Sequence, residues 1–305
     1  MQALDVVTGA FGFSGKYISQ RLLNMGRGVR TLTNHAPSQH DSRIEAVPLD
    51  FSDLPALTRR LEGAKVLYNS YWIRFGRGER THELAVANSK KLIQAAEAAG
   101  VERLVHVSIT NPSLESPLPY FSGKAEVEAA IRGSKLSYAI LRPAVLFGDE
   151  DILINNIAWM LRRLPVFAIP GDGKYRLQPI FVEDLATLAV EQGQQRENAV
   201  LNAVGPETFS YDELVRLIRE VVRSRSGLVH VAPQLVLMGA AALGWLLRDV
   251  VLTQDEIRGL MADLLFVGSE ATAPLPAGAT KLSTWLRDHA TTAGTKYASE
   301  LARHY

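Results

Sequence analysis

The sequence predicts an α/β fold in which helices cover both faces of a doubly wound parallel sheet. Short apolar segments alternate with helix-like segments through the first half of the 305-residue chain, and the connections between them are short. A glycine-spaced turn joins the first apolar segment to the first helix-like segment, an order of elements typical of a Rossmann-type sheet. The pattern loosens after Gly148, so we expect a smaller, mostly helical C-terminal region to follow.

Each strand is predicted from a short run of β-branched and aliphatic residues, and each helix from apolar residues at helical spacing. The strands are expected at residues 4–8, 29–33, 46–49, 66–68, 104–108 and 137–141. The helices between them are expected at residues 15–24, 54–61, 81–99 and 122–131. Because strands alternate with helices, neighbouring strands should run parallel, with their carboxyl ends at one edge of the sheet.

The glycine-spaced turn directly follows the first predicted strand. Gly9 allows a sharp turn, Gly12 allows the backbone to approach a phosphate, and Gly15 allows the helix to pack on the strand. Phe11 and Phe13 lie in the same turn. The free N–H groups and the positive dipole end of the helix would face an anion, so the turn predicts a site for a dinucleotide pyrophosphate. A plain strand-to-helix turn is the alternative interpretation.

The second half of the chain has a less regular pattern. Helices are expected at residues 153–164, 183–193 and 211–222, short strands at 178–182 and 200–204, and a loop rich in Pro and Gly at 165–174. Ser210 and Glu213 have the spacing of a capping box. We therefore assign residues 1–148 and 176–204 to a dinucleotide-binding domain, and residues 149–175 and 205–305 to a smaller substrate region.

Composition excludes several classes of function. A formal net charge of +1 gives no reason to expect a nucleic acid partner. The absence of cysteine excludes disulfides, thiol catalysis and cysteine-bound metals. The histidines are scattered, so we expect no metal site, and His106 in an apolar strand pattern should be a hydrogen-bonded core residue. The first strand begins too early to leave room for a signal peptide, so we expect a cytoplasmic location.

An almost wholly apolar segment spans residues 235–247. It is too short to cross a bilayer, which needs roughly 20 residues. A buried helix is one interpretation. A lid over an apolar substrate, or a surface for a peripheral membrane or protein contact, is the other.

Tyr120 and Lys124 form a Tyr-x-x-x-Lys pair, which a helix places on one face. A lysine beside a phenol favours the phenolate, so Tyr120 could act as general acid or base, and the ammonium could hold the ribose of a nicotinamide cofactor. Ser108 and Thr110 stand at the end of the preceding strand, where ligands bind in open parallel sheets. Either hydroxyl could bind a substrate oxygen, although loop capping, a turn and simple packing are structural alternatives.

Together these motifs resemble the short-chain dehydrogenase/reductase superfamily over residues 1–205, in particular its extended and atypical members. The matching segments are the glycine turn, residues 49–53, Asn88, residues 100–108, the Tyr120 and Lys124 pair, and residues 141–148 and 178–186. Within the superfamily the chain most resembles the branch that contains the nucleotide-binding accessory subunit of respiratory complex I. Bacterial relatives in that branch are described as epimerases or NAD(P)H-binding proteins.

The resemblance implies positions for the cofactor along the sheet edge. Asp50 and Phe51 would meet the adenine. The cofactor would be flanked by Asn69, Ser70 and Tyr71, and its nicotinamide end would contact Pro143 and Val145. The glycine turn and Lys124 complete the set of expected cofactor contacts.

The choice between NAD and NADP is expected at the end of the second strand, at Thr33, Asn34 and His35. An acid there would bind the ribose diol of NAD and repel the additional phosphate of NADP. No acid is present, and neutral donors take its place. We therefore expect NADP to be preferred, with NAD as the alternative.

The sequence thus predicts an NAD(P)-dependent oxidoreductase acting on a small-molecule substrate, for which an apolar compound is one candidate. Tyr120 would relay the proton, and Lys124 would lower the pKa of Tyr120. Thr110 or Ser108 would orient the substrate oxygen. A cofactor-binding scaffold or redox-sensing interaction protein without turnover is the first alternative, and a sugar-nucleotide epimerase or dehydratase is the second.

Overall fold

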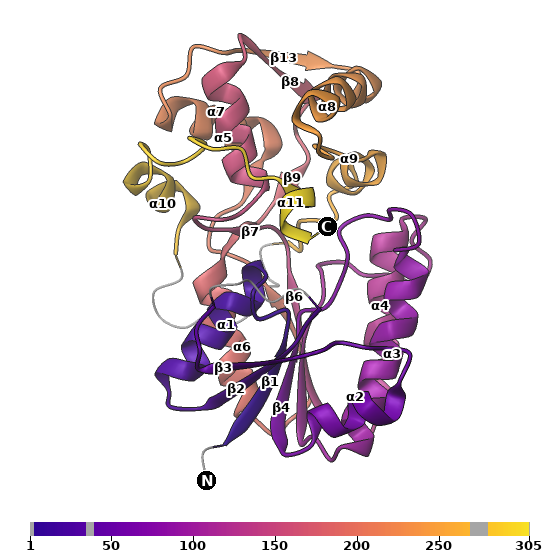
Figure 1. Ribbon diagram of the computed structural model, residues 1–305. Coiled ribbons are helices and arrows are strands. Elements are labelled where there is room, and N and C mark those ends of the chain that lie inside the picture. Colours follow the sequence, from indigo (N-terminus) through magenta and orange to yellow (C-terminus); the bar gives the residue numbers. More distant parts are fainter. Residues whose placement is uncertain (1–2, 35–39, 269–279, 305) are drawn as a thin grey trace. The chain divides into compact units, whose positions relative to one another are not determined.

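A computed structural model of the chain describes residues 3–34, 40–268 and 280–304 (Figure 1). The chain divides into two compact units. The first unit contains the described residues up to Pro143 together with Val182–Ala203. The second contains Ala144–Phe181 and the described residues from Val204 onward.

The first unit is built on a seven-stranded sheet in which every neighbouring pair is parallel. In sheet order its strands are β3 (Ile44–Val47), β2 (Gly28–Leu32), β1 (Leu4–Thr8), β4 (Ala64–Asn69), β5 (Arg103–Val107), β6 (Ser137–Pro143) and β11 (Ala199–Ala203). Successive strands run outward from β1 in one direction and from β4 in the other, so the order reverses between these two strands. The predicted doubly wound, Rossmann-type sheet is confirmed.

Helices cover both faces of this sheet (Figure 1). On one face α1 (Phe13–Asn24) packs against α6 (Val182–Gly193). On the other face α3 (His82–Ala98) packs against α2 (Leu54–Leu61) and α4 (Pro119–Arg132). The central strands are buried almost without interruption, because a parallel sheet covered on both faces has no side exposed to water.

The second unit contains the remaining helices and three two-stranded sheets. Its helices are α5 (Leu153–Arg163), α7 (Tyr211–Val221), α8 (Pro233–Leu247), α9 (Gln254–Met261), α10 (Leu282–Asp288) and α11 (Glu300–His304). Its strands are β7 (Leu146–Phe147), β8 (Val166–Pro170), β9 (Arg176–Leu177), β10 (Ile180–Phe181), β12 (Phe209–Ser210) and β13 (Gly227–Val231). The capping box that begins α7 at Ser210 and Glu213 is confirmed.

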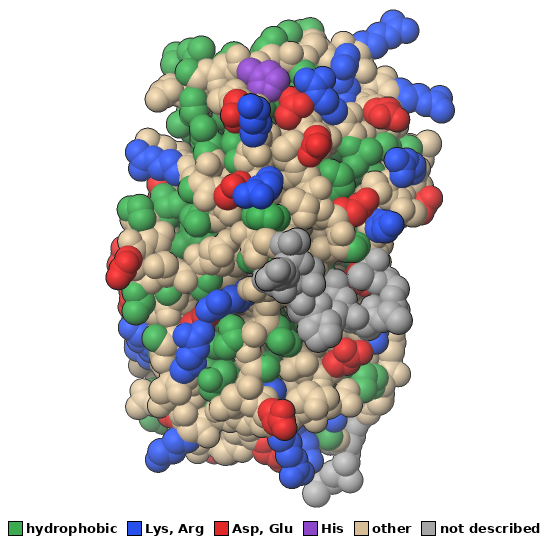
Figure 2. Space-filling model, turned by 180° about the vertical axis from the view of Figure 1, so that it is seen from behind, with side chains coloured by type: hydrophobic (Ala, Val, Ile, Leu, Met, Phe, Trp, Pro, Cys, Tyr) green, Lys and Arg blue, Asp and Glu red, His purple; other side chains and the backbone are tan. Residues whose placement is uncertain are grey.

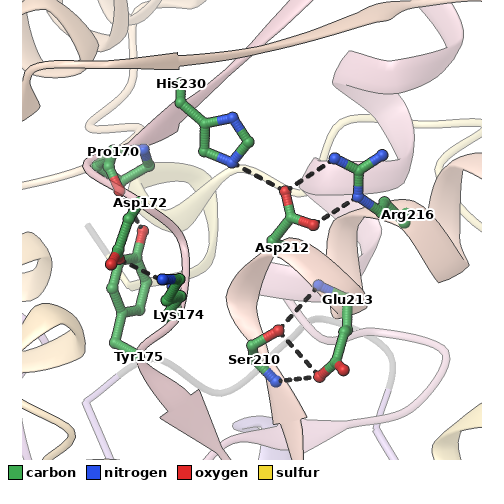
Figure 3. Close-up of polar contacts among 9 residues, drawn as sticks. All are labelled: Pro170, Asp172, Lys174, Tyr175, Ser210, Asp212, Glu213, Arg216 and His230. Carbon is green, nitrogen blue, oxygen red and sulfur yellow. Dashed lines mark hydrogen bonds and ion pairs between the residues drawn. The ribbon is translucent and has the colours of Figure 1, made fainter.

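Polar contacts hold α7 to β13 and close the loop that follows β8 (Figure 3). Asp212 on α7 accepts a hydrogen bond from Arg216 one turn later and lies 2.9 Å from Nε2 of His230 on β13. In the loop, the Tyr175 hydroxyl donates to the Pro170 carbonyl at 2.9 Å. Both sets of contacts stay within the second unit.

Two expectations for the second unit are wrong. The predicted loop at 165–174 contains β8, because β13, far along the chain, supplies a parallel partner that local Pro and Gly signals do not reveal. The apolar segment 235–247 forms α8, but it is not a buried helix: Gly244 is its one buried residue. No helix in the described part of the chain is both long and apolar enough to cross a membrane.

Candidate functional site

The glycine turn lies where β1 leads into α1, at the reversal point of the sheet. Gly9 has a φ of +67°, a left-handed conformation that favours glycine. A Cβ on Gly15 would lie 2.1 Å from the Gly9 carbonyl oxygen, so only glycine lets α1 start this close to the turn. The Ala10 N–H donates to Thr31 Oγ1 at 3.2 Å, which fixes the turn against β2.

The start of α1 fits a phosphate group. Gly12 is the N-cap residue, no side chain caps the first turn of α1, and this turn contains no acidic residue. The N–H groups of a first helical turn have no partner within the helix, and the helix dipole adds partial positive charge there. Phe11 and Phe13 flank this position and are half-buried. The predicted pyrophosphate site is therefore consistent with the local geometry.

The ends of β1 and β4 are joined by side chains predicted to flank the cofactor. Thr8 Oγ1 donates to Asn69 Oδ1 at 3.0 Å and accepts the Ser70 N–H at 2.9 Å. The Ser70 hydroxyl donates to the Thr8 carbonyl at 2.5 Å. The Asn69 amide lies 3.2 Å from His106 Nδ1, which confirms His106 as a hydrogen-bonded core residue. Burial lowers the pKa of His106 well below its usual range, so its ring is neutral.

Tyr71 and Phe51 form an aromatic pair at the same edge, with ring centroids 5.0 Å apart. The Tyr71 hydroxyl accepts a hydrogen bond from Asn88 at 3.0 Å, and burial raises the pKa of Tyr71. Asp50 is exposed, and hydrogen bonds from Ser52 lower the pKa of its carboxyl group. This part of the edge offers two aromatic rings, tilted by 52° to each other, and the Asp50 carboxylate next to Phe51 in the sequence.

The end of β2 carries the residues predicted to choose between NAD and NADP. Thr33 is half-buried, and its N–H donates to the Val47 carbonyl at 2.9 Å. The Asn34 side chain makes two hydrogen bonds with the backbone of Leu49, so its amide supports the loop. His35 lies outside the described residues.

Lys124 lies on α4 and is buried behind the carboxyl end of β5. Its Nζ donates to the Val107 carbonyl at 2.8 Å. Burial lowers the pKa of Lys124 to about 7, while the neighbouring Glu128 opposes this shift. Tyr120 lies one helical turn earlier and is half-buried, so the predicted pair shares one side of α4.

Trp72 packs against this pair, and the sequence analysis missed it. Gly123 lies between Tyr120 and Lys124 in the sequence. The Trp72 ring lies 3.1 Å from the position that a Cβ on Gly123 would take. The Lys124 ammonium lies 4.5 Å from the ring centroid, and the Tyr120 ring stands nearly perpendicular to it at 5.9 Å. The buried Trp72 Nε1–H finds no hydrogen-bond acceptor among the described residues. Trp72 directly follows Asn69, Ser70 and Tyr71 in the sequence, and this position could have indicated that it lies at the site.

Ser108 and Thr110 occupy different surroundings at the end of β5. The Ser108 hydroxyl donates to Glu128 at 2.6 Å, and this buried carboxylate also pairs with Arg132 and Arg142. Ser108 is therefore bonded to α4. Thr110 is buried, and its N–H donates to the Pro143 carbonyl at 3.0 Å. The sequence analysis also missed Glu128, which its spacing of one turn from Lys124 could have indicated.

The two residues predicted at the nicotinamide end lie on either side of the division between the units. Pro143 ends β6 in the first unit. Val145 belongs to the second unit, where it is buried and its carbonyl accepts the Ile180 N–H at 2.8 Å. Among the residues that the structure describes, no group of His, Asp and Glu is arranged to hold a metal ion.

Residues 9–157 match the family described as NAD(P)H-binding. One sequence relative is the NADH dehydrogenase [ubiquinone] 1 alpha subcomplex subunit 9 of Arabidopsis thaliana, 25% identical over 85% of this chain and 70% of the relative. Another is the ceramide reductase of Caulobacter vibrioides, 25% identical over 78% of this chain and 77% of the relative. Some further complex I relatives are matched over only about 60% of their own length.

Solved structures show the same fold. The triphenylmethane reductase of a Citrobacter species superposes with a TM-score of 0.75 at 20% identity, over 94% of this chain and 99% of the other. MoeE5 in complex with UDP-glucuronic acid and NAD gives a TM-score of 0.64 at 24% identity, over 75% of this chain and 85% of the other. Over residues 9–157 the chain is therefore similar to NAD(P)H-binding proteins, its sequence relatives resemble the extended short-chain dehydrogenase/reductase, epimerase-like family, and the solved structures share its Rossmann-type fold.

Proposed function

We propose that the protein is an NAD(P)H-dependent oxidoreductase that reduces a carbonyl group, or oxidises the corresponding alcohol, of a small apolar molecule. The observation that carries the proposal is the pairing of half-buried Tyr120 with buried Lys124 on one side of α4, next to the end of β5. This pairing supports the roles of Tyr120 as proton donor and of Lys124 as the cation that lowers its pKa, at the sheet edge where ligands of this fold bind.

We assign the cofactor to the residues predicted along the sheet edge. The glycine turn and the uncapped start of α1 would bind the pyrophosphate. Phe51 with Asp50 would meet the adenosine, and Pro143 and Val145 the nicotinamide end. When bound, the cofactor supplies or accepts the hydride.

Tyr120 would donate the proton to the substrate oxygen during reduction and accept it during oxidation. A charged Lys124 would stabilise the phenolate form of Tyr120. Thr110 would orient the substrate oxygen, because the Ser108 hydroxyl is already bonded to Glu128. One reductase among the sequence relatives is named for ceramide, and this name favours an apolar substrate here.

The test is transfer of deuterium from NADPH or NADH, labelled at the transferable position, to a panel of apolar aldehydes and ketones. Tyr120→Phe should lower the rate of transfer by about 100-fold or more and leave cofactor affinity within about twofold. Tyr138→Phe, a half-buried tyrosine on β6, is the matched control and should transfer at the normal rate. An unchanged rate in Tyr120→Phe would exclude it as the proton relay.

A second candidate is a protein that binds NAD(P)H without turnover and contacts a protein partner. Two observations favour it: the Lys124 ammonium is bonded to the Val107 carbonyl beneath Trp72, and Ser108 is bonded to Glu128. The complex I subunits among the relatives favour a protein partner. Tight cofactor binding with no deuterium transfer to any compound would support this candidate. Purification with firmly retained NAD would instead support an epimerase.

A further inference from the structure

The outward side of α8 is the most apolar exposed surface of the second unit. Four large side chains at helical spacing lie there, which we call the α8 face: Leu235 (56% exposed), Met238 (68%), Trp245 (84%) and Leu246 (70%). Single exposed apolar residues are common on proteins, but a row of them on one helix marks a contact surface. A tryptophan that is 84% exposed is the clearest member of the row.

The length and burial of α8 exclude the two usual places for such a helix. A helix that is apolar on all sides normally lies in a protein core or spans a bilayer. Only Gly244 of α8 is buried, so the helix is not in the core. Its 15 residues extend about 22 Å, short of the ~30 Å thickness of a bilayer core. The boundary between water and lipid is a third place that such a helix can occupy.

The charges around α8 fit an anionic lipid surface. Between Glu220 and Asp249 the sequence contains no acidic residue, while Arg223, Arg225 and Arg248 are exposed. Asp249 is turned inward, where it accepts the backbone N–H groups of Glu300 and Leu301. Figure 2 shows hydrophobic side chains at the end of the second unit that carries β13 and α8, and Lys and Arg side chains that project from the opposite side of the same end.

A groove between α8 and α9 adds a place for a lipid chain. It encloses about 430 Å³ and is lined on its apolar sides by Leu237, Ile257 and Met261. Arg258 also lines the groove. Its guanidinium lies 3.9 Å from the Asp255 carboxylate on the same helix, and it could also meet an anionic headgroup.

We propose that α8 docks this protein on membranes that contain anionic lipids, with the α8 face in the headgroup region and the neighbouring arginines on the lipid phosphates. Tryptophan is favoured at this depth because its ring is apolar and its N–H is polar. A bilayer accommodates an apolar helix of any side-chain pattern. A protein partner would need a matching groove, and acidic side chains opposite Arg223, Arg225 and Arg248.

The experiment is co-flotation of the full-length protein with vesicles of phosphatidylcholine, with and without phosphatidylglycerol. We expect binding to the mixed vesicles that weakens as salt is raised, together with a blue shift of Trp245 fluorescence that is absent in Trp245→Phe. The double variant Trp245→Ser/Leu246→Ser should lower the partition coefficient by about tenfold or more.

Two controls separate the α8 face from general surface changes. Met25→Ser/Leu114→Ser removes two exposed apolar side chains of the first unit and should bind vesicles normally. Arg223→Gln/Arg225→Gln/Arg248→Gln should lose the preference for phosphatidylglycerol, whereas Arg59→Gln/Lys65→Gln/Lys135→Gln should keep it. Circular dichroism and thermal unfolding of each variant serve as the folding control, because α8 belongs to the second unit and most of the candidate cofactor site belongs to the first.

Several results would overturn the proposal. These are failure to float with either vesicle, equal binding by the Trp245→Ser/Leu246→Ser variant, or a stable dimer that this variant dissociates. The last result would assign the α8 face to a second copy of the chain.

Discussion

Lys124 combines full burial with a charge that the proposed chemistry requires. Its environment disfavours the ammonium form, and the Val107 carbonyl, Glu128 and the Trp72 ring only partly offset this. Burial lowers its pKa in the folded protein to about 7, from 10.5 in an exposed lysine. Between these values the unfolded chain binds one more proton than the folded protein at this site. Stability therefore rises with pH across that window.

The Lys124→Met variant tests this directly, since methionine fills a similar space without titrating. From pH 7.5 to 9.5 the free energy of unfolding of the native protein should rise more steeply than that of the variant, by up to ~1.4 kcal/mol per pH unit. The measurement is reversible urea unfolding at several pH values. Lys65→Met, which removes an exposed lysine, should follow the native slope. Parallel curves for native protein and Lys124→Met would mean that Lys124 stays charged throughout.

The start of α1 depends on two glycines for different reasons, and paired variants separate them. A Cβ on Gly15 would lie 2.1 Å from the Gly9 backbone. Relieving this overlap requires a backbone shift, which costs more free energy than the rotation of a side chain. A Cβ on Gly12 would lie 3.3 Å from the Gly9 carbonyl oxygen, a contact that a small shift relieves, but it would stand where a phosphate approaches.

We therefore expect Gly15→Ala to lower the free energy of unfolding by about 3 kcal/mol. Gly12→Ala should stay within about 1 kcal/mol of the native protein and bind NADPH about tenfold more weakly. Thermal unfolding with and without cofactor, together with a fluorescence titration, measures both effects. Equal loss of stability in the two variants would contradict the separate roles assigned to these glycines.

The elements of the first unit could be predicted from the sequence because each is encoded locally. The bounds of β1 and α2 agree with the prediction at both ends, and the other strands and helices of the alternating region differ by a few residues. In the second unit β8 was missed, because its partner β13 lies far along the chain. The exposure of α8 could not be predicted from the local pattern either, since an apolar helix has the same sequence pattern whether it is buried or exposed.

The candidate site shows the same limit at the level of contacts. The glycine turn could be predicted because its function depends on backbone conformation within a few residues. The bond from Ser108 to Glu128 and the packing of Trp72 on Gly123 could not, because they join separate elements across the fold. These contacts decide which predicted hydroxyls and cations remain available to a substrate.

At the scale of the whole molecule, most of the expected cofactor contacts belong to the first of the two units, so cofactor binding should change the thermal unfolding of that unit. The glycine turn and the residues expected at the adenosine all belong to the first unit. A ligand that binds only the native state stabilises it by ~2.7 kcal/mol at one hundred times its dissociation constant. Calorimetry should therefore show a cofactor-dependent rise in the melting temperature of the transition that reports the first unit.

The size of that rise should depend on the cofactor, because the end of β2 offers Thr33 and no acid to bind a ribose diol. At equal concentrations NADPH should raise the melting temperature by several degrees more than NADH. Thr33→Asp places a carboxylate there and should reverse the order, by repelling the additional phosphate and accepting hydrogen bonds from the diol. A larger shift with NADH in the native protein would assign the preference to NAD. The absence of a shift with either cofactor would remove the binding site on which the proposed reaction depends.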